Sequence, residues 1–181
     1  MVTVRRATVA DAPAMGRLVA RAWQAAYRGQ MPDAYLDGLR PEDRAAYWDG
    51  VLRREDRRGA VLVAERAGEV VGFAAAGPSP DPEGAGELYA INVDPAHWGT
   101  GAGRALLEAA QAELDRMGFA ESVLWVLPGN VRARRFYERA GWTADGAEKT
   151  SEAFGVGFDE VRYRRRPSSA DSSSATPEGT E

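Results

Sequence analysis

Glycines at alternating positions give this chain its clearest chemical signal, in the segment Trp98-Gly99-Thr100-Gly101-Ala102-Gly103. The segment lies between an expected strand and an expected helix. Glycines let the backbone turn so that successive N–H groups converge on one point, and a helix N-terminus adds positive potential there. The pattern therefore predicts a phosphate or diphosphate site at 98–103. A tight strand-to-helix turn without a ligand is the alternative.

Two familiar phosphate-binding motifs do not fit this loop. The nucleotide P-loop ends in Gly-Lys-Ser/Thr, whereas Arg104-Ala105 follows Gly103 here. The dinucleotide fingerprint requires a third glycine at position 104 or 106, and these positions hold Arg104 and Leu106. A nucleotide-binding domain is therefore disfavoured.

The residue inventory restricts the remaining chemistry. The chain has no cysteine and a single histidine, His97. Thiol nucleophiles, Cys-ligated zinc and multi-histidine metal sites are thereby excluded, and we expect no metal. Reactions must run on carboxylates, phenols, hydroxyls, backbone amides or a bound cofactor. His97 itself, in a loop, is expected to be solvated rather than to act as a base or an adenosine contact.

Charge and hydropathy exclude two classes of partner. Net charge is −4, but three acids fall in 167–181, which leaves 24 acidic against 23 basic residues in 1–166. A nearly neutral domain gives no support for nucleic acid as a partner. No apolar run approaches the roughly 18 residues that span a bilayer, and the first residues lack the apolar core of a signal peptide. We therefore expect no membrane association and a cytoplasmic location.

The elements that position the loop follow from periodicity. Strands are expected at 2–8, 60–64, 70–74, 87–93 and 122–127, near Trp142 and at 160–165. A capping box, Thr8 to Asp11, opens a first helix, and a second follows Pro41. Further helices are expected from Gly103 or Arg104 to Met117 and from Asn130 to Ala140; the Pro/Gly-rich 77–86 is expected to be a loop.

This order predicts an α/β or α+β domain with a mixed sheet and helices on both faces. We expect one domain over 1–166. The Ser-rich segment 167–181 has no large apolar residue and is expected to be disordered.

Two motifs resemble the GNAT superfamily of N-acetyltransferases. The run ELYAINVDPAHWGTGAGRALLEAA is similar to its acetyl-CoA motif, with Gly101 and Gly103 matching and Trp98 standing where the family has Gln or Arg. The run SVLWVLPGNVRARRFYERAGW is similar to its second motif, through Asn130, Phe136-Tyr137-Glu138 and Gly141. The resemblance covers about residues 2–166. It implies a mostly antiparallel mixed sheet of about six or seven strands with about four helices.

The resemblance also implies a cofactor, acetyl-CoA, and the residues that hold it. Main-chain N–H groups make most phosphate contacts in this family, so Trp98 weakens the literal match more than the function. Three arginines, Arg132, Arg134 and Arg135, are candidates for the 3′-phosphate, with a solvated helix face as the alternative, and Arg135 is preferred. The cofactor-binding residues are then Ile91, Asn92, Val93, Trp98, Gly99, Thr100, Gly101, Ala102, Gly103, Arg104, Asn130, Arg135 and Phe136.

Catalytic roles follow by the same resemblance. Tyr137 occupies the position from which similar enzymes protonate the leaving CoA thiolate, and a phenol with a pKa of about 10 holds its proton at neutral pH. Glu87 is the best-placed carboxylate to accept the proton of the amine through water. A main-chain N–H near Val93 is expected to meet the oxyanion. A packing tyrosine and a solvated glutamate are the alternative interpretations.

The predicted function is acetyl transfer from acetyl-CoA to a primary amine of a small molecule or peptide, by direct transfer in a ternary complex. A non-catalytic acyl-CoA-binding module is the alternative. The acceptor is expected near aromatic residues of the first two helices, with Trp23 and Tyr27 preferred over Tyr35, Tyr47 and Trp48. The sequence leaves a homodimer open.

Overall fold

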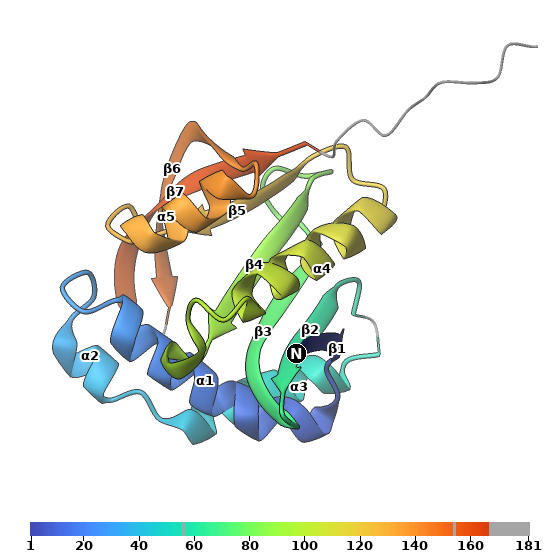
Figure 1. Ribbon diagram of the computed structural model, residues 1–181. Coiled ribbons are helices and arrows are strands. Elements are labelled where there is room, and N and C mark those ends of the chain that lie inside the picture. Colours follow the sequence, from blue (N-terminus) through green and yellow to red (C-terminus); the bar gives the residue numbers. More distant parts are fainter. Residues whose placement is uncertain (56, 154, 167–181) are drawn as a thin grey trace, which may run out of the picture.

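A computed structural model describes residues 1–55, 57–153 and 155–166. Its centre is a seven-stranded sheet in the order β1-β2-β3-β4-β5-β7-β6, shown in Figure 1. Every neighbouring pair is antiparallel except β4 and β5, which run parallel. The mostly antiparallel mixed sheet expected from the sequence is confirmed. The strands are Val2–Arg6 (β1), Ala60–Arg66 (β2), Glu69–Pro78 (β3), Gly86–Val93 (β4), Ser122–Val126 (β5), Thr143–Ala153 (β6) and Val156–Arg165 (β7).

Helices cover both faces of the sheet (Figure 1). Helices α1 (Ala12–Ala26) and α3 (Pro41–Arg53) pack on one face, and α4 (Ala102–Arg116) packs on the other. Helix α5 (Val131–Arg139) joins the α4 face through Tyr137 and Phe136. A five-residue helix, α2 (Asp33–Asp37), was not predicted, because its sequence is too short to show a period.

Alternation along the central strands divides the core between the two faces. Leu62 and Ala64 of β2 pack with the α4 cluster, while Val61 and Val63 pack with the α1–α3 cluster. Burial on both faces explains why this strand reads as a continuous apolar run. The expected capping box is present, since the Asp11 carboxylate accepts the N–H of Thr8 at 2.7 Å. It opens a 3-10 turn, Val9–Asp11, and α1 follows directly at Ala12.

Several strands are longer than their apolar patterns indicated. Strand β3 continues through Gly77 and Pro78 because both pair with β4, so the expected loop begins only after Pro78. Strands β6 and β7 form a long hairpin of polar residues, in which Thr150 bonds Asp159 and Ser151 bonds Glu160 across the strands. Apolar alternation cannot report such a hairpin. The segment 167–181 lies outside the described residues.

In the ranges that the structure describes, no helix combines the length and apolarity needed to cross a bilayer. In the same ranges, no group of three or more acidic or histidine side chains gathers as a metal site would require.

Candidate active site

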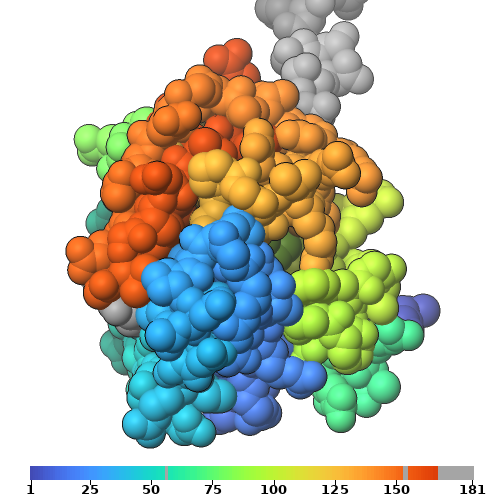
Figure 2. Space-filling model, turned by 90° about the vertical axis from the view of Figure 1, so that its left-hand side faces the viewer, coloured from blue at the N-terminus to red at the C-terminus, as the bar shows by residue number. Residues whose placement is uncertain are grey.

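A cavity of about 620 Å³ opens where the two parallel strands part. Strands β4 and β5 pair only over Gly86–Ser122, Glu87–Val123 and Leu88–Leu124. Figure 2 shows the resulting hollow between α1, α4 and α5. Its lining comprises Ala22, Ala25, Ala26, Gln30, Ile91, Asn92, Val93, His97, Trp98, Gly99, Gly101, Gly103, Arg104, Gly129, Asn130, Val131, Arg132, Ala133, Phe136, Tyr137 and Arg139.

One wall is the glycine loop that leads into α4. Gly99 and Gly101 adopt φ angles of +75° and +92°, which side-chain-bearing residues rarely reach, and a Cβ added at either would meet no atom within 4 Å. Gly101 is the N-cap of α4, so the next amides, of Ala102, Gly103 and Arg104, have no acceptor within the helix. The loop therefore presents free N–H groups and the positive end of a 15-residue helix to one cavity.

The opposite wall is the first part of α5. The Asn130 side chain caps this helix by accepting the N–H of Ala133 at 3.1 Å. The helical period then turns Ala133, Phe136 and Tyr137 toward the cavity. Asn130 therefore fixes where α5 begins, and through that the position of the two aromatic rings.

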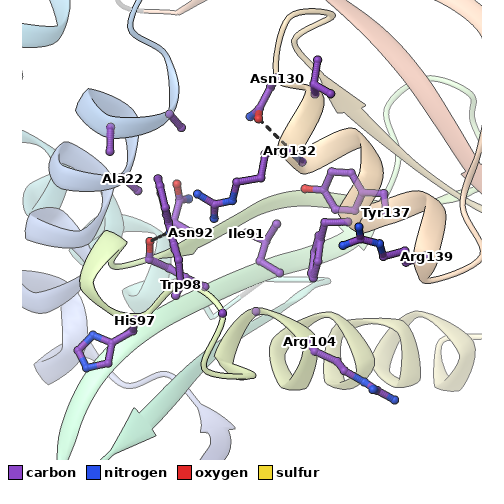
Figure 3. A pocket seen from close by; sticks show the side chains of 18 of the residues that line it. Ala22, Ile91, Asn92, His97, Trp98, Arg104, Asn130, Arg132, Tyr137 and Arg139 are labelled. Carbon is purple, nitrogen blue, oxygen red and sulfur yellow. Dashed lines mark hydrogen bonds between the residues drawn. The ribbon is translucent and has the colours of Figure 1, made fainter.

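Tyr137 is the phenol of the cavity. Its side chain is 7% exposed, and Figure 3 shows its hydroxyl directed into the cavity. Burial, followed by the proximity of the Tyr27 phenol, raises its pKa above the usual range. The hydroxyl consequently keeps its proton at neutral pH.

Glu87 lies beside the cavity rather than in its wall. It belongs to the part of β4 that still pairs with β5, four residues before Ile91, a span of about 13 Å along a strand. Ser79 Oγ donates a hydrogen bond to Glu87 Oε2 at 2.8 Å. Burial raises the pKa of Glu87, and the Ser79 hydrogen bond and the charge of Lys149 oppose that shift.

The aromatic residues of α1 lie behind its cavity wall. Ala22, Ala25 and Ala26 line the cavity, whereas the rings of Trp23 and Tyr27 meet edge to face at 5.4 Å and pack into the core. Burial, with a smaller effect of the Glu160 carboxylate, raises the pKa of Tyr27 to about 12. Small residues on one face of α1 thus leave room for a ligand.

Most of the cofactor residues expected from the sequence line this cavity. Three do not: Thr100, whose Oγ1 donates to the His97 carbonyl at 2.8 Å, Ala102, which is buried beneath the loop, and Arg135. His97 borders the cavity, and in Figure 3 its ring points away from Trp98. The sequence analysis did not name several other lining residues, among them Gln30, Gly129 and Arg139, and no local pattern marks them.

The fold and the cavity define a class of protein. The sheet parts between its two parallel strands, and the amides that begin α4 face a buried phenol across one cavity. Residues 20–142 match the sequence model described as the acetyltransferase (GNAT) family. This chain therefore belongs to the GNAT family and is an N-acetyltransferase.

Two relatives illustrate different extents of similarity. The chain is 33% identical over 163 residues to the uncharacterized N-acetyltransferase YuaI of Bacillus subtilis, covering 89% of this chain and 91% of the relative. It is 43% identical over 91 residues to a mycothiol acetyltransferase of Thermobispora bispora, covering 46% of this chain. That match spans only 31% of the length of the mycothiol enzyme.

A solved structure shares the fold. The PaiA N-acetyltransferase of Thermoplasma acidophilum, crystallised with coenzyme A, superposes with a TM-score of 0.73. The match covers 92% of this chain and 99% of that one at 15% identity. This likeness extends to the architecture of the whole sheet and its helices.

Proposed function

We propose that this protein transfers an acetyl group from acetyl-CoA directly to a primary amine of a small molecule or peptide, in a ternary complex. The observation that carries the proposal is the pairing of the free amides of the glycine loop with the Tyr137 hydroxyl in one cavity. The first arrangement suits a diphosphate, and the second suits a leaving thiolate.

The chemistry of the cavity suits a CoA thioester. The open space over Gly99 and Gly101 is where a Cβ would obstruct a diphosphate, and the amides of Ala102 and Gly103 would donate to it. The end of β4, Ile91 to Val93, has left β5 and offers an unpaired edge to the extended arm of the cofactor. Acetyl-CoA supplies the activated acetyl thioester.

The acceptor must lose a proton before it can attack. An alkylammonium has a pKa near 10, about three units above pH 7. Removing its proton at pH 7 therefore costs about 4 kcal/mol. Glu87 is the base in our proposal, and it receives this proton through water. Its raised pKa makes the carboxylate a better proton acceptor than a solvated glutamate.

The leaving group needs a proton in turn. The Tyr137 hydroxyl donates a proton to the departing sulfur. The resulting phenolate then takes up a proton from solvent or the proton released by the acceptor amine. An amide N–H near Val93 would stabilise the oxyanion as the carbonyl becomes tetrahedral. Trp23 and Tyr27 would act from behind α1, by setting the shape of the acceptor end rather than by touching the cofactor.

Cofactor binding is tested by calorimetry with CoA on a matched pair of variants. Gly101→Val places a side chain in the space proposed for the diphosphate and should abolish binding. Gly118→Val is the control: Gly118 also has a left-handed φ, +84°, and open surroundings, but lies at the other end of α4. Both substitutions cost similar backbone strain, so equal CoA affinity in the two variants would contradict the proposal.

Catalysis is tested by screening primary amines with acetyl-CoA and detecting released thiol. At least one amine should raise thiol release well above the rate of the Gly101→Val variant. CoA binding by the wild type without turnover of any amine would contradict acetyl transfer while leaving the binding site intact.

A further inference from the structure

The Arg132 side chain crosses the cavity. Arg132 belongs to the first turn of α5, while Trp98 precedes the glycine loop on the opposite wall. The guanidinium carbon lies 3.2 Å from the centroid of the Trp98 ring, a cation–π stack that bridges the two walls (Figure 3). The sequence alone does not indicate this contact, since 33 residues separate Trp98 from Arg132.

Trp98 is a fixed platform for this cation. Its indole Nε1 donates a hydrogen bond to the Val93 carbonyl at 2.9 Å, which ties the ring to the end of β4. A guanidinium stacked by its face keeps the N–H groups of its edge available to another acceptor. The stack therefore aims planar donors into the cavity.

Besides this stack, Arg132 makes no ion pair among the described residues. Within the described residues, no carboxylate lies in ion-pair range of Arg132, whereas its neighbour across the cavity, Arg104, pairs with Glu108 at 2.7 Å. A cation in the first turn of a helix is also unfavourable toward the helix dipole, and the first turn of α5 holds no acid to offset it. Burial alone, with no opposing acid, lowers the pKa of Arg132.

We propose that Arg132, held on the Trp98 ring, binds the diphosphate of the cofactor from the α5 side and clamps it against the amides that begin α4. Trp98 is then a positioning residue that acts through Arg132. The inference rests on the proposed function, because it assumes that the cavity takes a CoA thioester. A guanidinium is suited to this task since it offers two parallel N–H donors to phosphate oxygens.

Three probes test which part of the cofactor Arg132 contacts: CoA, 3′-dephospho-CoA, and pantetheine, which lacks the diphosphate. Arg132→Gln should lower the affinity for CoA and for 3′-dephospho-CoA by about 10- to 100-fold, the range expected for loss of a hydrogen bond to a charged group. Pantetheine affinity, followed by NMR titration, should not change. A loss of affinity for CoA alone would place the contact at the 3′-phosphate and overturn the proposal. An equal loss of affinity for pantetheine would also overturn it.

The control for charge is Arg135→Gln, measured with 3′-dephospho-CoA. It removes the same charge from the same helix at a position that does not line the cavity, and it should leave affinity within about twofold. Losses of equal size in the two variants would overturn the proposal. Arg132→Lys should recover only part of the affinity, because an ammonium neither stacks nor binds through two donors.

A double-mutant cycle tests the role of Trp98. Trp98→Leu alone should weaken the binding of 3′-dephospho-CoA. Added to Arg132→Gln, it should have little further effect on binding, because Trp98 contributes through the guanidinium. Additive losses would overturn the positioning role. If the wild type fails to bind CoA, the proposed function itself fails; if it binds and Arg132→Gln binds equally well, only this inference fails.

Discussion

The two parts of the sheet are built differently. Strands β1 to β4, here called the sealed part, lie between α1 and α3 on one face and α4 on the other, and most residues of β2 and β3 are buried. Strands β5, β7 and β6 end in a polar hairpin held by ion pairs, among them Arg162–Asp145 at 2.9 Å and Arg164–Asp145 at 3.1 Å. The site lies between these parts, where they share only three residue pairs.

This contrast separates the two requirements of the proposed reaction. The sealed part carries the glycine loop, so close packing fixes the amides that would bind the diphosphate. The other part, through α5, contributes side chains: Tyr137 for chemistry and Arg132 for the clamp. Packing changes in the first part should therefore lower stability, whereas side-chain changes on α5 should lower turnover or cofactor affinity. Glu87, in β4 where the two parts meet, should affect turnover.

The largest effect is expected from the reacting phenol on the α5 side. Tyr137→Phe removes one hydroxyl and keeps the packed ring, so stability and CoA affinity should persist while kcat falls by about 10²- to 10⁴-fold. Steady-state kinetics beside CoA calorimetry measure both. Full activity of the variant would contradict the acid role. An equal loss of CoA affinity would show that the hydroxyl binds rather than reacts.

A substitution in the sealed part should act on stability instead. A Cβ at Gly16 of α1 would come within 2.3 Å of the Pro41 carbonyl oxygen and 2.6 Å of the Ala45 nitrogen in α3, and backbone atoms cannot move aside cheaply. Gly16→Ala should lower the free energy of unfolding by about 1–3 kcal/mol. Gly50→Ala, in α3 with open surroundings, is the control and should raise it by about 0.5–1 kcal/mol. Chemical denaturation of both variants checks the sign of each change.

Glu87, the proposed base, should affect the pH dependence of activity. Glu87→Gln should lower kcat/KM by about 10- to 100-fold at pH 7, with partial recovery at high pH, where more of the amine is already neutral. The Tyr137→Phe loss should not recover. In the wild type, activity should fall as pH drops through the raised pKa of Glu87 and the carboxylate takes up a proton. A pH-independent loss in Glu87→Gln would place the base elsewhere, with a water chain to solvent as the next candidate.

The smallest effect is expected from an ion pair at the β1 edge of the sealed part. The Arg5 guanidinium bonds both oxygens of Asp11, and this bonding lowers the Asp11 pKa to about 2. Because the folded pKa is depressed, the stabilisation is present above the unfolded pKa, near 4, and is lost as pH falls through 2. Arg5 is 40% exposed, so solvent screening limits the contribution to about 1 kcal/mol. The stability difference between wild type and Asp11→Asn should shrink between pH 4 and pH 2 in acid titrations of unfolding.

Features encoded within a few neighbouring residues could be predicted from the sequence. The loop at 98–103 needs glycines for its backbone angles, and the apolar run of β2 and the capping box before α1 are local patterns. The two resembling motifs then indicated the sheet and most of the residues that line the cavity. The length of the β6–β7 hairpin and the existence of α2 were missed, because polar strands and very short helices lack a hydrophobic period.

The sequence by itself determined which backbone could turn at Gly99 and Gly101, and that a phenol would follow Phe136 on the next helix. Only the tertiary structure decided that Glu87 stands beside the cavity and that Arg132 reaches Trp98. These outcomes depend on where β4 and β5 stop pairing, at Leu88 and Leu124. That point is set by the packing of two layers of helices on a twisted sheet, and no local run of residues carries it.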